Sequence, residues 1–190
     1  MMSIRAATEA DVPAMLSIYD EFVRHTAVSF EYETPSQADF TLRLREHIAV
    51  YPWLVYEENG TVLGYAYAGR AFERAAYAWN AEISCYLAAS VRRRGIGRQL
   101  YARIEEILRN MGVRKVFAVV TSANMPSVAF HHALGYRDTA RFSDVGFKHG
   151  AWYDVLWLEK QLCPLGTPEA FPTPWKCAVA GSRGGQQNGT

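Results

Sequence analysis

The feature that most constrains the fold is an unbroken apolar run at residues 116–120. A strand without polar alternation is expected to be buried on both faces, inside a sheet that helices cover. The run follows a helical pattern in which Leu100, Ile104 and Leu108 recur on one side, and Gly112 suits the C-cap of that helix. We therefore expect a mixed α/β domain around a central sheet.

Other segments extend this pattern along the chain. Thr8 and Asp11 have the spacing of a capping box at the start of an amphipathic helix, and Asn59-Gly60 between two β-rich runs predicts a hairpin. Asn124 can cap a short helix that runs to residue 132 or 133. Strands are predicted at residues 3–6, 53–56, 62–68, 79–87, 116–120, 136–147 and 152–158, and another helix at residues 36–49.

The composition indicates one globular domain. Of the 190 residues, 49% are hydrophobic, and the net charge of +1 indicates neither a nucleic-acid nor a membrane partner. The three cysteines are too few and too far apart for a disulfide framework or a zinc site, and a reducing environment suits them. No stretch approaches the roughly 18 apolar residues of a membrane span. We expect a cytoplasmic protein that binds no metal.

The composition changes after residue 162. Residues 163–190 contain four prolines and end in a glycine-rich stretch. Such a composition is typical of a loosely attached tail, although Trp175 can dock part of it. The sequence therefore predicts a domain at residues 1–162 and a tail at residues 163–190.

A basic loop with two glycines joins the strand at residues 79–87 to the helix that follows. Glycine permits close approach of the backbone, and a helix N-terminus presents free N–H groups at the positive end of its dipole. Arginine adds bidentate pairing with phosphate oxygens. We expect this loop to bind a phosphate group, although a helix start with a solvated basic face has the same composition. The loop consists of Arg92, Arg93, Arg94, Gly95, Ile96 and Gly97, with Arg98 one position further.

The spacing of the loop excludes two other phosphate-binding motifs. No Gly-Lys-Ser/Thr follows, as the Walker pattern requires, and no third glycine completes a dinucleotide fingerprint. The loop instead resembles the Gln/Arg-x-x-Gly-x-Gly/Ala pattern of the GNAT superfamily, where it holds the pyrophosphate of acetyl-CoA. The family's second signature, Asn-x-x-Ser/Ala…Leu-Gly-Phe/Tyr, is similar to Asn124, Ser127, His131 and Leu134-Gly135-Tyr136.

Within that superfamily, most of the chain resembles the phosphinothricin acetyltransferases. The resemblance implies a mixed, mostly antiparallel twisted sheet of about seven strands with about four helices. It also implies a homodimeric N-acetyltransferase with acetyl-CoA as the donor. The expected reaction is direct attack by the α-amine of a small acceptor such as phosphinothricin, methionine sulfone or methionine sulfoximine. The similar segments are residues 4–11, 51–55, 66–69, 76–82 and 146–152.

Acetyl transfer to an amine needs one group that removes a proton and another that tolerates or protonates the departing thiolate. Glu82 lies in an otherwise apolar strand, where burial would raise its pKa, although a solvent-facing strand glutamate also fits the pattern. The resemblance assigns Glu82 as the general base and His131 as a second catalytic residue. This imidazole could take the amine proton or supply one to sulfur. His132, its neighbour on the helix, should face elsewhere.

Donor contacts are expected beyond the basic loop. The resemblance implies that the backbone of Cys85 and Leu87, with Tyr86 between them, meets the acetyl and pantetheine parts. It adds Asn124 and Ser127 beside the pantetheine arm, and Asn124 can also cap its own helix. Cys85 suggests an acyl-cysteine intermediate, but direct transfer is favoured because no histidine is adjacent in the sequence.

The acceptor is expected to lie against the early helices and the loop at residues 69–79. Arg74 is placed by the resemblance to pair with a carboxylate, and an exposed loop arginine is the competing interpretation. The acceptor-binding residues suggested by the resemblance are Phe30, Arg74, Tyr77 and Tyr86.

Two positions depart from the phosphinothricin branch. Glu31 and Phe72 stand where bialaphos-pathway relatives carry basic side chains. The loss of positive charge weakens the case for a dianionic acceptor, so methionine sulfone, methionine sulfoximine or another amino acid becomes comparably suited. Two other interpretations remain open. One is acetylation of a protein N-terminus, a lysine or an aminoglycoside, and the other is a non-catalytic acetyl-CoA-binding module that needs neither Glu82 nor His131.

Overall fold

The structure is a computed structural model that describes residues 2–183 of the chain. Within this range the strands form one seven-stranded sheet in the order β1-β2-β3-β4-β5-β7-β6. Neighbouring strands are antiparallel except β4 with β5, which confirms the mixed, mostly antiparallel sheet. The strands are β1 (Met2–Ala6), β2 (Trp53–Glu58), β3 (Thr61–Arg70), β4 (Asn80–Leu87), β5 (Lys115–Thr121), β6 (Arg137–Lys148) and β7 (Ala151–Gln161).

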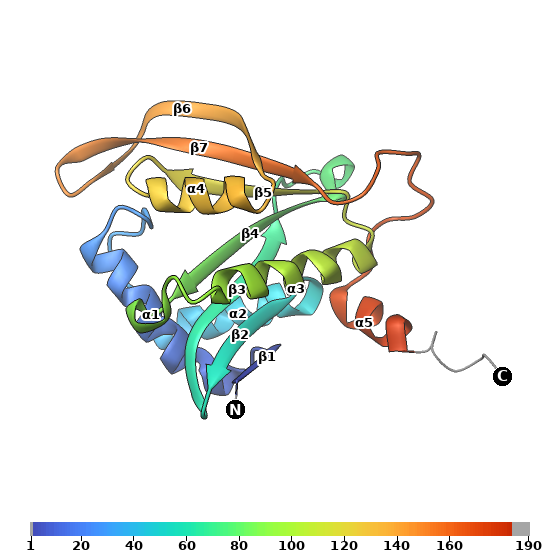
Figure 1. Ribbon diagram of the computed structural model, residues 1–190, viewed down its shortest axis with the longest axis horizontal. Helices are drawn as coiled ribbons and strands as arrows, with labels where there is room; N and C mark the ends of the chain where they lie inside the picture. Colours follow the sequence, from blue (N-terminus) through green and yellow to red (C-terminus); the bar gives the residue numbers. More distant parts are fainter. Residues whose placement is uncertain (1, 184–190) are drawn as a thin grey trace.

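Helices cover both faces of the sheet (Figure 1). Alternate residues of β2 enter two separate cores: Trp53 and Val55 pack with α1 and α2, whereas Leu54 and Tyr56 pack with α3. The sheet is therefore the middle of three layers, as the sequence predicted. The helices are α1 (Val12–His25), α2 (Gln37–Val50), α3 (Ile96–Met111), α4 (Met125–Ala133) and α5 (Trp175–Arg183).

The local signals in the sequence form the expected structures. The capping box of Thr8 and Asp11 is present at the turn before α1. Asn59 and Gly60 have φ angles of 51° and 82°, the left-handed conformation that a two-residue hairpin turn requires. Asn124 caps α4, because its side chain accepts a hydrogen bond from the Ser127 N–H at 3.3 Å.

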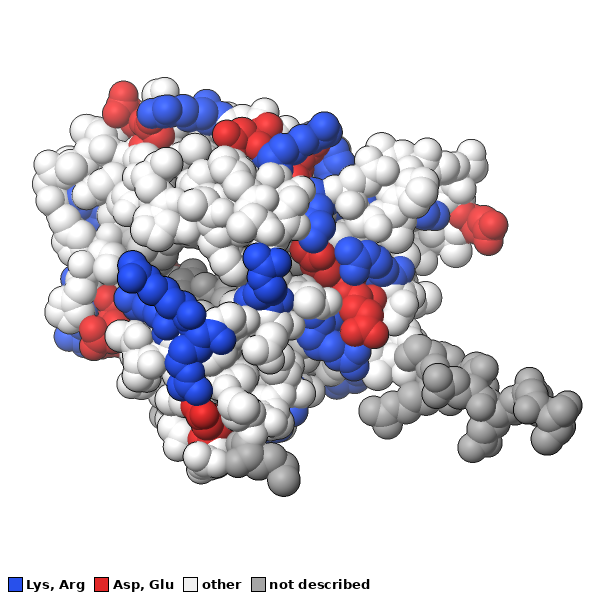
Figure 2. Space-filling view, viewed as in Figure 1, with Lys and Arg blue, Asp and Glu red and all other residues white. Residues whose placement is uncertain are grey.

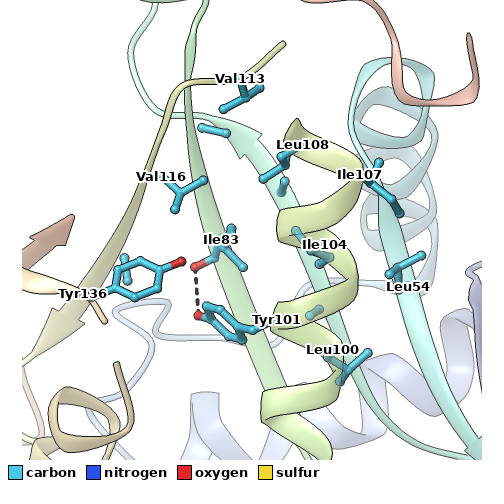
Figure 3. Close-up of a cluster of buried hydrophobic side chains, with 14 of the residues drawn as sticks. Leu54, Ile83, Leu100, Tyr101, Ile104, Ile107, Leu108, Val113, Val116 and Tyr136 are labelled. Carbon is cyan, nitrogen blue, oxygen red and sulfur yellow. Dashed lines mark hydrogen bonds between the residues drawn. The ribbon is translucent and has the colours of Figure 1, made fainter. Parts of the chain in front are cut away.

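The apolar stripe of α3 packs on the centre of the sheet. Figure 3 shows Tyr101 and Leu108 of this helix on the side of Ile83 of β4 and Val116 of β5, with Leu100 on the other side of the helix. All of them are buried, with exposures of 0–2%. Burial of this apolar surface contributes on the order of 2 kcal/mol for each large side chain, so α3 is fixed firmly on the two central strands.

The only parallel pair within the described chain, β4 with β5, is short. Its register joins residues 80–82 to residues 115–117 and ends with Glu82 opposite Phe117. Beyond this point β4 continues beside β3, and β5 continues beside β7. The two strands diverge, and the sheet opens between them (Figure 1).

The opening corrects one expectation. The run at residues 116–120 was predicted to be buried on both faces, but Val119 is 39% exposed. Val119 lies beyond the last pair of β4 with β5 and lines the cavity in the opening. Hydrophobic patterning alone cannot distinguish a residue that a helix covers from one that faces a cavity.

The described part of the C-terminal segment is anchored to the domain. Trp175 is buried, and its Nε1 donates a hydrogen bond to the Ile48 carbonyl of α2 at 2.9 Å. Trp79 donates to the Ala170 carbonyl at 3.2 Å and stacks on Phe171 with ring centres 4.9 Å apart. The boundary after residue 162 stays a prediction, but these contacts differ from the loose attachment that the composition suggested. The last residues of the predicted tail lie outside the described part of the chain.

Candidate active site

A cavity of about 440 Å³ occupies the opening between β4 and β5. Successive residues of β4 line the cavity. Ile83 and Cys85 lie on the face that α3 covers, whereas Ser84 and Tyr86 lie on the opposite face. The cavity is therefore lined by residues from both faces of the sheet. Figure 2 shows Lys and Arg side chains gathered beside a hollow on the face where α3 begins.

The loop before α3 brings a helix N-terminus to the cavity. Arg93 and Gly95 have φ angles of 62° and 79°, and α3 begins directly after Gly95. Gly95, Ile96 and Gly97 line the cavity, and the N–H groups of the first helical turn have no partner within the helix. A Cβ added at Gly97 would lie 3.3 Å from Cζ of Phe130, so glycine allows α3 to pack closely on α4. The cavity meets the positive end of the α3 dipole, which suits a phosphate.

The structure separates the predicted arginines into two groups. Arg92, Arg93 and Arg98 line the cavity. Arg94 instead pairs with Glu58 of β2, with 2.9 Å between Nη2 and Oε1. Three guanidinium groups therefore border the cavity, and the fourth is held toward the β2–β3 hairpin.

His131 is buried in the wall of the cavity and is bonded at both ring nitrogens. Its Nδ1 lies 2.7 Å from the Ser127 carbonyl oxygen, and its Nε2 lies 2.7 Å from the Tyr101 hydroxyl. Because a carbonyl oxygen only accepts, Nδ1 carries the proton and donates it, whereas Nε2 accepts from Tyr101. Burial lowers the pKa of His131 below its ordinary value, so the imidazole is neutral near pH 7.

Tyr101 lines the same cavity, and sequence analysis did not find it. The residue falls within the apolar stripe of α3, beside Leu100 and Ile104, so its pattern is that of a core aromatic side chain. The available signal was its position one turn after Gly97, which places it on the helix face that continues from the basic loop. Burial raises the pKa of Tyr101 well above its ordinary value, so the hydroxyl keeps its proton.

Glu82 lies at the apex of the opening, in the last residue pair that joins the two strands. Its side chain is half-buried and shares a face of β4 with Ser84 and Tyr86, both of which line the cavity. Glu82 itself borders this wall and does not line the cavity. Burial raises the pKa of Glu82 above its ordinary value, the direction that a general base near neutral pH requires.

Cys85 lines the cavity but is poorly suited to act as a nucleophile. Burial raises the pKa of its thiol to about 12, and the thiolate is the reactive form. Both ring nitrogens of His131 are already bonded to other groups. Direct transfer therefore remains favoured over an acyl-cysteine.

Asn124 and Ser127 line the cavity at the start of α4. The carbonyl oxygen of the Asn124 side chain is used by the helix cap, which leaves the amide N–H groups as donors. The Ser127 hydroxyl lies 3.3 Å from Nδ1 of His131. The two residues present polar groups along one wall of the cavity.

The four predicted acceptor residues are not brought together. Tyr86 lines the cavity. Phe30 packs on β6 so closely that a Cβ added at Gly146 would lie 2.1 Å from its ring. Arg74 and Tyr77 lie at the exposed turn after β3 and do not line the cavity. Their roles stay predictions.

The described part of the chain shows neither a metal centre nor a membrane span. No three His, Cys, Asp or Glu side chains within residues 2–183 are placed to hold a metal ion. No helix in this range is long and apolar enough to cross a membrane. The polar groups at the cavity are guanidinium, hydroxyl, amide and imidazole groups, which suit a ligand that carries phosphates.

Comparison with known proteins identifies the class that this fold and cavity define. Residues 4–157 match the family model described as the acetyltransferase (GNAT) domain. The chain is 38% identical to a phosphinothricin N-acetyltransferase of Streptomyces viridochromogenes, over 81% of this chain and 84% of that protein. It is 36% identical to the L-methionine sulfoximine/L-methionine sulfone acetyltransferase of Salmonella typhimurium, over 89% and 99% respectively. A GNAT phosphinothricin acetyltransferase from Sinorhizobium meliloti, in complex with acetyl-CoA, superposes with a TM-score of 0.82, at 34% identity over 90% of this chain and 93% of that one.

The chain belongs to the GNAT family of acetyltransferases. It is an acyltransferase, and acetyl-CoA is its acetyl donor. The residues present fit that donor, because a helix N-terminus and three arginines border a cavity in the opened sheet. The predicted resemblance to phosphinothricin acetyltransferases is confirmed by these relatives.

Proposed function

We propose that the protein transfers the acetyl group of acetyl-CoA to the α-amine of a small amino-acid-like acceptor. The acceptor would be of the phosphinothricin, methionine sulfone or methionine sulfoximine type. The observation that carries this proposal is the opening between β4 and β5, with a helix N-terminus at one face and Glu82 at its apex on the other. Relatives named for such acceptors match most of the chain, which supports the proposal.

The proposed donor site is the α3 side of the cavity. When bound, acetyl-CoA supplies an acetyl thioester, and its pyrophosphate would meet the backbone N–H groups at the start of α3. The part of β4 beyond Glu82 has no β5 partner, so the backbone of Cys85 and Leu87 is free on that edge to meet the acetyl and pantetheine parts. Asn124 and Ser127 would contact the pantetheine arm. The loop residues proposed to hold the pyrophosphate are Arg92, Arg93, Gly95, Ile96, Gly97 and Arg98, with Arg94 contributing charge at longer range.

Glu82 is the proposed general base, directly or through one water molecule. A carboxylate whose pKa is raised by burial holds an abstracted proton better than an exposed one. The proton would pass from the acceptor nitrogen to a carboxylate oxygen of Glu82. Ser84 and Tyr86, on the same face of β4, would form the wall beside the acceptor.

His131 is proposed to act through Tyr101. The Tyr101 hydroxyl donates its proton to Nε2 of His131, and Tyr101 lines the cavity, so this bond fixes the place of the hydroxyl group in the cavity wall. This group could turn toward the negative charge that develops on the departing sulfur. Because the pKa of His131 is lowered, the imidazole has no second proton to supply near pH 7.

The acceptor is proposed to carry a neutral side chain. Phe72 lies with its ring centre 5.5 Å from Phe117 and 5.5 Å from Trp157, and Phe117 is the β5 partner of Glu82. An aromatic surface beside the base makes desolvation of a second negative charge costly. This favours acceptors of the methionine sulfone or sulfoximine type over phosphinothricin.

A homodimer is proposed through the exposed face of the β6–β7 hairpin. Phe142, Val145, Phe147 and Trp152 are 49%, 53%, 46% and 60% exposed, and β6 is an edge strand. Contiguous exposed apolar side chains are typical of interaction surfaces. Light scattering after size-exclusion chromatography should give twice the chain mass, and a monomer mass would contradict this proposal.

The test of the function is a thiol-release assay with acetyl-CoA and a panel of L-amino acids that includes methionine sulfone, methionine sulfoximine and phosphinothricin. We expect turnover with at least one free amino acid, with the N-acetyl product identified by mass spectrometry. Turnover with a peptide N-terminus, a lysine side chain or an aminoglycoside alone would overturn the acceptor class. Tight acetyl-CoA binding without turnover of any acceptor would reduce the protein to a binding module.

A further inference from the structure

Lys148, the last residue of β6, is almost completely buried, with an exposed fraction of 2%. Its Nζ donates hydrogen bonds to the carbonyl oxygens of Val23, at 2.6 Å, and Ser29, at 2.7 Å. Buried lysines are usually paired with carboxylates, but Lys148 forms no ion pair within the described chain. The carboxylate of Glu31 is instead bonded to Arg43 at 2.5 Å. The Lys148 amino group is therefore committed to the backbone.

The two carbonyl groups belong to both ends of one short segment. Val23 lies in the last turn of α1, where carbonyl groups have no partner within the helix. Ser29 lies six residues later, in the link to α2. A positive charge near a helix C-terminus is stabilised by the helix dipole, which offsets part of the cost of burying this charge. One amino group thus fastens the segment between Val23 and Ser29 to the end of β6, and Figure 1 shows this segment reaching the β6–β7 hairpin.

The fastened segment borders the cavity on the side of α1. Phe22 and Val28, at the two ends of the segment, line the cavity. The Ser29 hydroxyl bonds to the Tyr19 hydroxyl at 2.7 Å, and the Tyr19 ring meets Tyr86 edge-on with centres 5.0 Å apart. Tyr86 is itself part of the cavity wall. Tyr86 and the bond between Ser29 and Tyr19 lie on the side opposite α3, whereas the Phe22 ring also lies 5.2 Å from the guanidinium carbon of Arg92.

Two neighbouring residues of β6 also hold the chain that follows the segment. Phe30 packs against Gly146, and the Tyr32 hydroxyl donates to the Phe147 carbonyl. These contacts hold residues beyond Ser29 but leave α1 untouched. Lys148 is the β6 residue that ties the end of α1 and the following link together.

We propose that Lys148 is a positioning residue for acceptor binding. It sets the place of the cavity wall formed by Phe22, Val28 and Tyr86, through its hydrogen bonds to Val23 and Ser29. The inference rests on the proposed function in taking the α1 side of the cavity as the acceptor side. Donor binding, on the α3 side, should depend much less on Lys148, because its hydrogen bonds reach Val23 and Ser29 rather than the loop before α3.

The experiment compares Lys148→Met, which keeps the length and loses the donor, with Lys148→Gln, which keeps one amide donor group. In Lys148→Met the acceptor KM should rise at least about ten-fold, because bonds from a charged donor are lost. The kcat and the Kd of acetyl-CoA should stay within about two-fold of the wild type. Lys148→Gln should show a smaller rise. The control is Lys176→Met, which changes an exposed lysine of α5, away from the cavity, and should leave the acceptor KM unchanged.

A second measurement does not depend on turnover. Amide hydrogen exchange, read by mass spectrometry, should be faster in residues 24–32 of Lys148→Met than in the wild type and unchanged in residues 92–98. An unchanged acceptor KM, or an equal loss of acetyl-CoA affinity, would overturn the proposal, because Lys148 would then have either no role or only a general structural one. Unchanged exchange in residues 24–32 would overturn it as well. If Lys148→Met does not fold, the same outcomes apply to Lys148→Gln.

These readouts separate the two proposals. A wild-type protein that turns over no amino acid removes the proposed function, and the exchange of residues 24–32 then decides whether Lys148 fastens this wall. A wild-type protein that is active, with an unaltered acceptor KM in Lys148→Met, removes the positioning role and leaves the function intact.

Discussion

The two sides of the opened sheet are built in different ways. Much of the α3 side comes from one short stretch, residues 92–98, completed by β5 and α4. The α1 side is assembled from distant segments, and its Lys148–Val23 hydrogen bond joins residues 125 positions apart. Backbone N–H groups bind phosphate wherever glycines bend a chain into a helix start, so a short motif can specify the donor side. An acceptor is recognised by side chains that only the complete fold brings together.

The largest expected effect concerns turnover at the junction of the two sides. Glu82→Gln should lower kcat about 10²–10⁴-fold because it removes the proposed base. The Kd of acetyl-CoA, measured by calorimetry, should change less than about two-fold. Glu57→Gln is the matched control, since Glu57 is a strand glutamate paired with Arg5. An unchanged kcat in Glu82→Gln would mean that Glu82 is not the general base.

The pH dependence sharpens this assignment. Because burial raises the pKa of Glu82, the acidic limb of kcat/KM should lie above the ordinary glutamate value of about 4.3 and should be absent in Glu82→Gln. The fold favours protonated Glu82, so the stability from this group is present below the unfolded pKa and is lost as pH rises through the folded pKa. Glu82→Gln should therefore have a higher Tm than the wild type near about pH 8, and the gain should shrink below about pH 4. A lower Tm at the higher pH would contradict the sign of this shift.

The next effect isolates the donor side. Gly95→Asp should weaken acetyl-CoA binding at least about ten-fold more than Gly95→Asn, because the carboxylate repels phosphate. Both substitutions strain the left-handed backbone similarly, and an added Cβ at Gly95 meets no described atom within 4 Å. Calorimetric titration of both variants gives the difference. Equal affinities would contradict a phosphate at this loop.

A smaller effect tests whether the acceptor side of the cavity selects acceptors by the charge of their side chains. Phe72→Arg should raise kcat/KM for phosphinothricin relative to methionine sulfone by about ten-fold, because a guanidinium can pair with the additional negative charge. Phe171→Arg, a substitution of an exposed aromatic residue in the C-terminal segment, is the control. A ratio that does not move would show that the aromatic cluster does not contact the acceptor.

The smallest effect on activity is expected away from both sides. Trp175→Ala should leave both KM values within about two-fold, because Trp175 contacts α2 and α3 rather than the cavity. It should destabilise the fold by about 2–4 kcal/mol and lower Tm by about 5–15 °C. Cys177→Ala, at an exposed position on the same helix, should do neither. Unaltered thermal unfolding in Trp175→Ala would instead support the prediction that the C-terminal segment is loosely attached.

Most of the fold could be predicted because its signals are local. The capping box at Thr8, the Asn59-Gly60 turn and the apolar stripe of α3 each specify their element through residues close in sequence. The helix α5 could not be predicted in this way. It is short, and what stabilises it is the packing of Trp175 on distant helices rather than its own propensity.

The candidate site divides along the same line. The arginines and glycines at residues 92–98 are enough by themselves to predict a phosphate site. Glu82 could be distinguished from other strand glutamates only by the resemblance to a known family. Tyr101 and Lys148 were missed because each is defined by a distant partner. The imidazole of His131 distinguishes Tyr101 from a core tyrosine, and the backbone of residues 23 and 29 distinguishes Lys148 from a surface lysine.

The opening between β4 and β5 also has a consequence for the order of events. Because the cavity is lined from both faces of the sheet, we expect each ligand to enter from its own side, so that neither has to leave before the other arrives. Initial-rate plots at several fixed acceptor concentrations should therefore intersect, as in a ternary-complex mechanism, and should not run parallel as a covalent shuttle on Cys85 would require. Intersecting plots would show that the donor and the acceptor are bound at the same time, rather than that the protein carries the acetyl group between two separate binding events.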